Sequence, residues 1–274
     1  MQNSEIILVG GAGKTGNRVA LRLAERGIGH RFASRSSKRP FDWQDRPTWR
    51  SALAGATGAY VTFQPDLSVA WAAEAIGALA RTALDCGLQH IVLLSGRGEE
   101  GAQRSEEALK ASGIGYTVLR ASWFCQNFSE GAFAESIAAG ELALPAGEVK
   151  EPFIDADDIA DAAVVALTDR RHVGMTYELT GPRSITFREA VAEIAEASGR
   201  TVAYRQTSIG DFKAGLAAAG LPQGTIDLLE ELFSQVLDGR NSQVMNGTPD
   251  ILGRPAKDFG AYAEEAAAAG AWGA

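Results

Sequence analysis

The sequence is poor in cysteine and has no long apolar run. Its two cysteines, Cys86 and Cys125, cannot form a disulfide framework, which is typical of a protein from the reducing cytoplasm. No apolar stretch approaches the roughly 18 residues needed to cross a bilayer. The first residues, Met-Gln-Asn-Ser-Glu, lack the basic segment of a signal peptide. We therefore expect a cytoplasmic protein without a membrane partner.

The sequence also lacks an excess of positive charge. It has 26 Lys and Arg against 34 Asp and Glu, a net charge of −8. Because nucleic-acid binding needs clustered basic residues, we expect no nucleic-acid partner. The three histidines are isolated and the two cysteines lack metal-ligand spacing, so we expect no metal site. The absence of a Gly-x-Ser-x-Gly motif argues against the most common α/β hydrolases.

Short apolar segments alternate with helical patterns over the first two thirds of the chain. Segments of about five residues separated by helices indicate βαβ units and a parallel sheet. We expect an α/β fold with a Rossmann-type, doubly wound parallel sheet. The expected strands are 5–9, 30–33, 59–63, 90–94, 115–119 and 176–179, and the expected helices are 14–26, 48–54, 67–84, 102–111 and 156–167.

The pattern becomes mostly helical after residue 120. The expected helices there are 123–139, 187–197, 211–219 and 225–237, and the Ala/Gly-rich segment 265–274 is expected to fray. We predict a Rossmann domain over residues 1–150 and a smaller, mostly helical substrate domain over residues 151–274. The helix over 156–168 is expected to pack back on the Rossmann sheet.

Three glycines, Gly10, Gly13 and Gly16, lie between the first expected strand and the first expected helix. In this context they allow a tight turn, a close approach of the backbone to a pyrophosphate, and close packing of helix on strand. The pattern predicts dinucleotide binding. Gly13-Lys14-Thr15 also resembles the end of a P-loop, but Leu8 occupies the position where that motif requires glycine.

The second expected strand is followed by Ser34 and Arg35, without a carboxylate. NAD sites place an acidic residue there to bind the ribose 2′-hydroxyl, whereas an arginine suits a 2′-phosphate. This difference favours NADP(H). Asp42 is the first carboxylate downstream, and it could hold the edge of the adenine instead of the ribose.

Ligands of open parallel sheets bind beyond the carboxyl ends of the strands. Those ends carry Gln64, Ser95, Arg97 and Arg120, together with aromatic residues around position 123. An acidic cluster formed by Asp155, Asp157, Asp158 and Asp161 precedes and opens an expected helix. We interpret these carboxylates as stabilising the helix N-terminus.

Several segments together resemble the NmrA-like atypical short-chain dehydrogenase/reductases. Within that family the chain is most similar to the ergot-alkaloid branch of festuclavine synthases and agroclavine dehydrogenases. The Gly-Lys-Thr loop, Phe41-Asp42-Trp43, Trp123-Phe124 and Arg240-Asn241-Ser242 draw the comparison to this branch. The segments that carry the family resemblance are 10–16, 41–43, 92–95, 119–127, 152–160 and 177–182.

The resemblance implies a site for NADP(H). It implies pyrophosphate contacts from the glycine loop, 2′-phosphate contacts from the end of the second strand, and nicotinamide or substrate contacts from later strand ends. The implied residues are, in that order, Gly10, Gly13, Lys14, Thr15 and Gly16; Ser34 and Arg35; and Gln64, Ser95, Trp123 and Phe124. Phe128 and Phe233 are further candidates for the substrate site, with core packing as the alternative for each.

The Tyr-x-x-x-Lys pair of the wider superfamily is missing, because no tyrosine is followed four residues later by lysine. We therefore predict an NADP(H)-dependent oxidoreductase that delivers hydride to a small electrophile, with iminium or imine compounds favoured. Ser95 and Gln64 would orient the reactants, and no catalytic acid is assigned. The alternatives are an NADP(H)-sensing regulatory protein and a quinone reductase. The sequence leaves the small-molecule substrate unnamed and the oligomeric state open.

Overall fold

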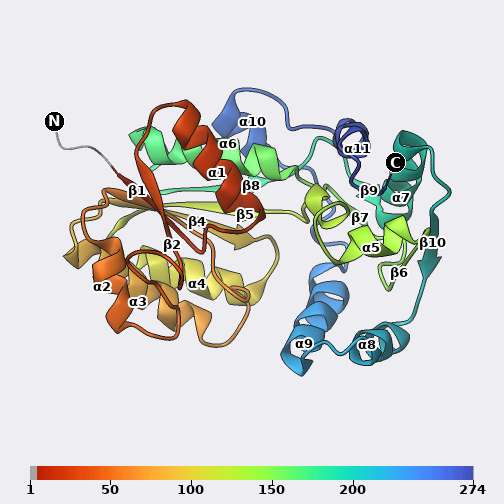
Figure 1. Ribbon diagram of the computed structural model, residues 1–274, viewed down its shortest axis with the longest axis horizontal. Coiled ribbons are helices and arrows are strands. Elements are labelled where there is room, and N and C mark those ends of the chain that lie inside the picture. The colour runs from red at the N-terminus through yellow and green to blue at the C-terminus, as the bar shows by residue number, and fades with distance from the viewer. Residues whose placement is uncertain (1–4, 274) are drawn as a thin grey trace. The chain divides into compact units, whose positions relative to one another are not determined.

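The computed structural model describes residues 5–273, so the expectation about the first four residues and the position of Ala274 lie outside it. Its main sheet has six parallel strands in the order β2-β1-β3-β4-β5-β8 (Figure 1). The order reverses at β1, since the chain moves first to β2 on one side and later to β3 on the other. The strands are β1 Ile6–Val9, β2 His30–Ala33, β3 Gly58–Val61, β4 His90–Gly96, β5 Gly115–Ala121 and β8 Met175–Leu179.

Helices cover both faces of this sheet (Figure 1). One face carries α1 (Lys14–Glu25), α6 (Ala156–Thr168) and α10 (Gly247–Leu252). The other carries α2 (Pro47–Leu53), α3 (Ala72–Asp85) and α4 (Glu100–Lys110). The predicted Rossmann-type, doubly wound fold is therefore confirmed.

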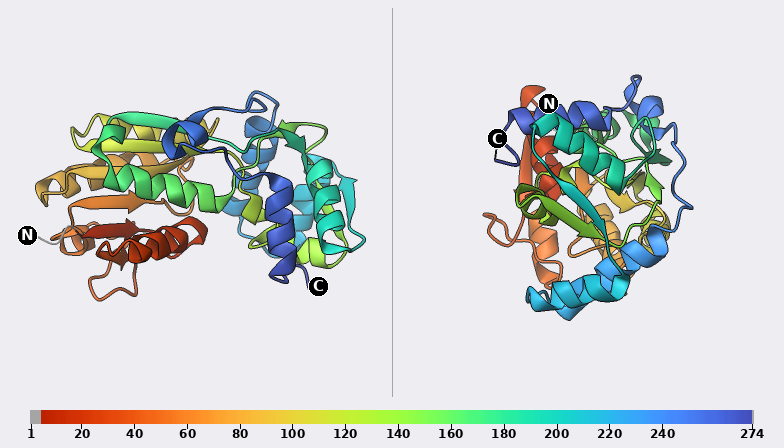
Figure 2. Two further views of the ribbon diagram at one scale, coloured as in Figure 1. Left: turned by 90° about the horizontal axis from the view of Figure 1, so that it is seen from above. Right: turned by 90° about the vertical axis from the view of Figure 1, so that its right-hand side faces the viewer.

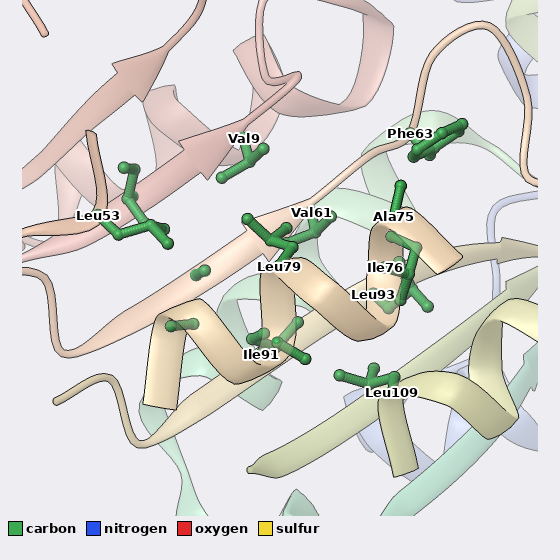
Figure 3. Close-up of a cluster of buried hydrophobic side chains, with 14 of the residues drawn as sticks. Val9, Leu53, Val61, Phe63, Ala75, Ile76, Leu79, Ile91, Leu93 and Leu109 are labelled. Atoms are coloured by element: carbon green, nitrogen blue, oxygen red, sulfur yellow. The ribbon is translucent and has the colours of Figure 1, made fainter. Parts of the chain in front are cut away.

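The core between the sheet and α3 and α4 is built from alternate strand residues (Figure 3). Ile91 and Leu93 of β4 lie in one buried cluster with Leu79 of α3 and Leu109 of α4. Val92, between the first two, is fully buried as well. Burial of successive residues explains why this strand is continuously apolar, as expected for a strand covered on both faces.

On the opposite face, α1 and α6 lie side by side (Figure 2). Ion pairs join the two helices. Arg22 of α1 binds Asp157 at 2.8 Å and also binds Asp161. Arg254 binds Asp158, which is buried, and the partly exposed Asp161, both at 2.6 Å. These three carboxylates of the acidic cluster thus pair with arginines from other elements of the fold.

The chain forms two compact units whose boundaries differ from the expected division at residue 150. Within the described residues, the first unit contains 5–121, Ala156–Leu179 and Asn246–Arg254, and the second contains Ser122–Asp155, Thr180–Met245 and 255–273. The difference arises because β8 extends the main sheet beside β5 and α6 packs on α1. Local sequence patterns do not indicate which sheet a strand joins.

The second unit has its own aromatic core and two small sheets. β6 pairs with β10 in parallel, and β7 pairs with β9 in antiparallel fashion. Its strands are β6 Glu141–Leu144, β7 Lys150–Glu151, β9 Ile185–Thr186 and β10 Ala203–Gln206. Its helices are α5 Ala132–Ala138, α7 Phe187–Ser198, α8 Ile209–Ala218, α9 Gln223–Glu231 and α11 Phe259–Ala268, with a 3₁₀ turn at Cys125–Asn127 and a π turn at Leu232–Val236.

Two expectations for this unit are wrong. The helix expected over 123–139 forms only over α5, Ala132–Ala138, because the segment at its start is extended at Phe124, where the backbones of Trp123 and Cys125 hydrogen-bond to that of Ile154. The segment over 265–274 is not frayed where it is described. Trp272 is 1% exposed, and its Nε1 donates a hydrogen bond of 2.7 Å to the carbonyl of Phe128.

In the described part of the chain, every helix is too short or too polar to cross a bilayer.

Candidate functional site

The loop after β1 and the first turn of α1 contain two glycines, Gly10 and Gly16, that the packing requires. Gly10 has a φ of +70°, and a Cβ there would lie 2.2 Å from the carbonyl oxygen of Thr62. A Cβ on Gly16 would lie 2.2 Å from the carbonyl oxygen of Gly11. Both positions exclude any larger residue on steric grounds.

Gly13 is different, because no packing contact explains it. Its φ of −95° is accessible to every residue, and a Cβ there would meet no described atom within 4 Å. Gly13 also precedes the first turn of α1 and provides no side-chain cap. The loop therefore leaves open space beside backbone N–H groups at the positive end of a helix, where an anion is favoured.

Thr15 anchors the loop through its side chain. The hydroxyl of Tyr60, on β3, donates a hydrogen bond of 3.0 Å to Thr15 Oγ1, and both residues are buried. Burial raises the pKa of the Tyr60 phenol, so it remains a neutral donor. Thr15 would therefore contact a pyrophosphate through its backbone N–H, since its side chain is directed into the protein.

A cavity of about 770 Å³ lies beside this loop in the first unit. Its position fits the switch in strand order at β1, where ligands of doubly wound sheets bind. Five of the predicted cofactor residues line it: Gly10, Ser34, Arg35, Asp42 and Gln64. The remaining lining residues are Ala12, Ala33, Ser36, Phe41, Trp43, Gln44, Pro65 and Trp71. Gly13, Lys14, Thr15, Gly16 and Ser95 are outside this lining.

Arg35 is the basic group in the cavity lining. It is exposed and has no hydrogen bond or ion pair to any residue in 5–273. By contrast, Arg31 and Arg39 both donate to the carbonyl of Ala54, beyond the end of α2. Beside Arg35, the hydroxyl of Ser34 lies 3.2 Å from that of Ser36 and 3.0 Å from that of Ser37. An available guanidinium next to clustered hydroxyls is suited to binding a phosphate.

Phe41, Trp43 and Trp71 form another wall of the cavity, and Phe63, which is outside the lining, packs against the two tryptophans. The ring centroid of Trp43 lies 5.0 Å from that of Phe41 and 4.5 Å from that of Phe63. The ring of Phe63 lies 4.6 Å from that of Trp71. Such a wall offers apolar area to a flat ring.

Ser95, at the carboxyl end of β4, belongs to a buried polar network. Its hydroxyl donates a hydrogen bond of 2.6 Å to Glu106 of α4, which is fully buried. Arg120 of β5 donates to both oxygens of Glu106, at 2.6–3.0 Å. These hydrogen bonds raise the pKa of the Arg120 guanidinium. Because an ionised carboxylate only accepts, the Ser95 proton is directed to Glu106.

The network continues to Glu178 of β8. Glu178 lies 3.6 Å from Arg120 and accepts a hydrogen bond of 2.9 Å from Arg97. Both arginines expected at the strand ends are therefore paired. Neither glutamate was among the site residues predicted from the sequence. Glu106 had a detectable signal, because it lies on the same helical stripe as the buried Ala102 and Leu109.

The aromatic candidates of the second unit differ in burial. Trp123 and Phe124 are half-buried, and the Trp123 ring lies 5.0 Å from Phe233. Phe128 is fully buried, and Phe233 is 4% exposed. The Phe128 ring packs against Phe153 and Phe259 within the core of this unit. Packing accounts for Phe128 and Phe233 in this structure, and a substrate contact by either of them stays a prediction.

Known proteins are similar in sequence to this chain over almost its whole length. An NAD(P)H azoreductase of Xenophilus azovorans is 28% identical over 96% of this chain and 98% of its own length. An agroclavine dehydrogenase of Claviceps fusiformis is 28% identical over 95% of this chain and 96% of its own length. The second of these agrees with the resemblance to the ergot-alkaloid branch.

A solved structure has the same fold. The NADPH-dependent quinone oxidoreductase of Escherichia coli, in complex with NADPH, superposes with a TM-score of 0.77 at 24% sequence identity. The match covers 95% of this chain and 99% of that chain. The model of the NmrA-like family matches residues 102–244, which is more than half of the sequence. The chain therefore belongs to the NmrA-like family.

Proposed function

We propose that this protein is an NADPH-dependent reductase of small electrophilic molecules. The observation that carries the proposal is the unpaired guanidinium of Arg35 in a cavity that also contains Gly10 of the helix-opening loop. The name of the Xenophilus relative, an NAD(P)H azoreductase, supports a nicotinamide cofactor.

The cavity and the adjacent start of α1 fit the pyrophosphate and the 2′-phosphate of NADPH. Backbone N–H groups of Gly13, Lys14, Thr15 and Gly16 would hold the pyrophosphate with Gly10 at the turn, and the open space beside Gly13 leaves room for it. Ser34 and Arg35 would hold the 2′-phosphate. The segment from Ser34 to Lys38 contains no carboxylate that would repel it.

Bound NADPH supplies a hydride from C4 of its nicotinamide ring. Ser95 and Gln64 lie at the carboxyl ends of neighbouring strands and would orient the reacting groups. Trp123 and Phe124 are proposed to contact the nicotinamide or the substrate, and Phe128 and Phe233 to contribute to the substrate site. Their main contribution would be to position the electrophile and exclude water.

The favoured substrates are iminium or imine compounds. Hydride addition to a ketone places negative charge on oxygen and benefits from a proton donor. An iminium ion is already cationic, so hydride addition gives a neutral amine without a proton. The Ser95 hydroxyl donates its hydrogen bond to Glu106, and the Tyr-x-x-x-Lys pair is missing. Neither residue set offers a proton to a ketone oxygen, which supports iminium compounds as the substrate class.

The test is NADPH oxidation in the presence of cyclic iminium ions, quinones, enones and aldehydes of similar size. We expect the iminium compounds to react fastest. Faster reduction of quinones would favour a quinone reductase. Tight NADPH binding without turnover of any compound would instead favour a regulatory protein that senses the cofactor.

A further inference from the structure

Glu106 fixes the direction of the Ser95 hydroxyl at the carboxyl end of β4. Its Oε1 accepts a hydrogen bond of 2.6 Å from Ser95 Oγ and one of 2.9 Å from Nε of Arg120. Its Oε2 accepts two more from the same guanidinium, from Nε at 3.0 Å and from Nη2 at 2.6 Å. Glu106 is also fully buried. The arginine therefore holds both carboxylate oxygens, and one of them stays beside Ser95.

Ser95 is left as a hydrogen-bond acceptor. In the part of the chain that the structure describes, its hydroxyl makes no hydrogen bond besides the one to Glu106. A serine hydroxyl has one proton and two lone pairs, so both lone pairs remain without a protein donor. The residue is only 4% exposed, so bulk water reaches it poorly. A ligand group that donates a hydrogen bond is favoured here, and a group that only accepts is disfavoured.

This polarity separates two kinds of electrophile at the proposed reductase site, on which this inference depends. A protonated imine carries an N–H next to the carbon that receives the hydride, and this N–H can donate to Ser95 Oγ. A ketone or aldehyde has an oxygen there, which would face the lone pairs of Ser95 with no proton between them. On reduction, the iminium carbon gains the hydride and the electron pair of the C=N bond moves to nitrogen. The products are a neutral amine and NADP⁺, and no other proton is needed.

We propose that Glu106 is a positioning residue that acts through Ser95 and selects protonated imines with an N–H over carbonyl compounds. Glutamine at position 106 would reverse the polarity. Because Nη2 of Arg120 lies only 2.6 Å from Oε2, it holds the amide oxygen at that place and leaves the amide NH₂ at the place of Oε1. The NH₂ then donates to Ser95 Oγ, and the Ser95 proton becomes available to a ligand oxygen.

The experiment compares protonated Δ¹-piperideine, its N-methyl iminium ion and cyclohexanone, which share one ring size. The two iminium ions have the same charge and differ in the N–H. Initial rates of NADPH oxidation give kcat/KM for each substrate. We expect the wild type to prefer the N–H ion over the N-methyl ion. Ser95→Ala should reduce this preference by about tenfold, the smaller effect expected of a hydrogen bond to a charged group.

Glu106→Gln tests the reversal of polarity. It should raise kcat/KM for cyclohexanone, relative to the N-methyl iminium ion, by about tenfold, because the Ser95 proton can then bind the ketone oxygen. The gain should be absent from the Ser95→Ala/Glu106→Gln double variant, which has the same change of charge without the hydroxyl. A thermal unfolding curve identifies any loss of folding, and the Ser95→Ala comparison does not require a Glu106 variant to fold.

Glu107→Gln is the matched control. It removes the same charge from the adjacent, exposed glutamate, which pairs with Lys110 at the surface. The N–H preference and the ratio of cyclohexanone to N-methyl iminium ion should both stay unchanged.

The possible results separate this inference from the proposed function. A wild type that oxidises NADPH with none of these compounds, nor with quinones, enones or aldehydes, contradicts the proposed function, and this inference falls with it. Reduction of quinones without reduction of either iminium ion supports a reductase and overturns the inference. An N–H preference that is unchanged in Ser95→Ala overturns the acceptor role of Ser95. A gain with cyclohexanone that is absent from Glu106→Gln, or retained in the double variant, overturns the role of Glu106.

Discussion

The hydroxyl of Ser95 donates a hydrogen bond of 2.6 Å to Glu106, while Arg120 donates to both oxygens of the same carboxylate. Ser95 can therefore offer a ligand only its lone pairs. We expect Ser95→Ala to reduce kcat for an iminium substrate by no more than about tenfold, whereas loss of a general acid costs about 10²–10⁴-fold. Steady-state kinetics with a cyclic iminium ion tests this expectation. A decrease above a hundredfold at unchanged KM would show that Ser95 transfers a proton.

The same network predicts a large difference between two adjacent glutamates. Glu106→Ala should destabilise the protein by about 3–5 kcal/mol, because it leaves Arg120 without its buried partner. Glu107 is exposed and pairs with Lys110 at the surface, so Glu107→Ala should change the free energy of unfolding by less than about 0.5 kcal/mol. Urea denaturation of both variants provides the comparison. Similar values for the two would mean that the Glu106–Arg120 pair adds little stability.

Gly13 and Gly16 should respond in opposite ways to alanine. Gly13→Ala should fold with unchanged or slightly increased stability, because its backbone conformation suits alanine. The added methyl group should weaken NADPH binding by about five- to a hundredfold, equivalent to about 1–3 kcal/mol of overpacking. Gly16→Ala should instead destabilise the fold by about 1–3 kcal/mol, since its Cβ would overlap the backbone of Gly11. Calorimetric titration and thermal unfolding distinguish the two effects, and unchanged NADPH affinity in Gly13→Ala would place the pyrophosphate elsewhere.

Arg35 should determine the choice between NADPH and NADH. Arg35→Ala should weaken NADPH binding by about ten- to a hundredfold, as expected for a charge-assisted hydrogen bond, and leave NADH binding nearly unchanged. Arg39→Ala is the control, because the Arg39 guanidinium donates to the carbonyl of Ala54 and does not line the cavity. Titration of both variants with NADPH and with NADH measures the dissociation constants that test this expectation. If Arg35→Ala weakened the binding of NADPH and NADH by the same factor, Arg35 would not bind the 2′-phosphate.

His90, at the start of β4, should make the protein sensitive to mild acid. Burial and the nearby Arg170 lower the pKa of its imidazole to about 4, from an ordinary value of 6.5. The unfolded chain therefore binds the proton more readily. The stabilisation is complete above pH 6.5 and is lost as the pH falls towards 4.

The loss should be on the order of 1–2 kcal/mol, since the ring is partly exposed. In His90→Gln, stability should vary less between pH 7 and pH 5, because the amide can still donate to Thr117 Oγ1. Urea denaturation at the two pH values measures the difference. An identical decrease in the wild type and the variant would assign the acid sensitivity to other groups.

The parts of the structure that depend on local sequence were predictable. The strands from β1 to β5 and the glycine loop follow from apolar runs and from Gly10 and Gly16, whose positions reflect neighbouring backbone. Arg35 was identified because it follows β2 directly. Each of these signals comes from a few consecutive residues.

The parts that depend on distant residues could not be predicted in this way. Glu106 is explained by Arg120, which comes from the next strand, and Glu178 comes from β8, far along the chain. The extended backbone at Phe124 depends on Ile154, about thirty residues later. In such cases the neighbouring residues can indicate that a side chain is buried, as Ala102 and Leu109 do for Glu106, but they do not identify its tertiary partner.

The discontinuity of the first unit has a consequence for synthesis and for recombination. Its edge strand β8 and the segment that carries Arg254 follow long stretches of the second unit. The amino-terminal half therefore cannot complete its fold on the ribosome until Arg254 has emerged, unlike domains that fold one after another during translation. A chimera that exchanges the second unit with that of a relative must likewise keep Ala156–Leu179 and Asn246–Arg254 from the parent of the first unit. A single crossover at residue 121 would separate Arg22 from Asp157 and Asp161, and β5 from its neighbour β8.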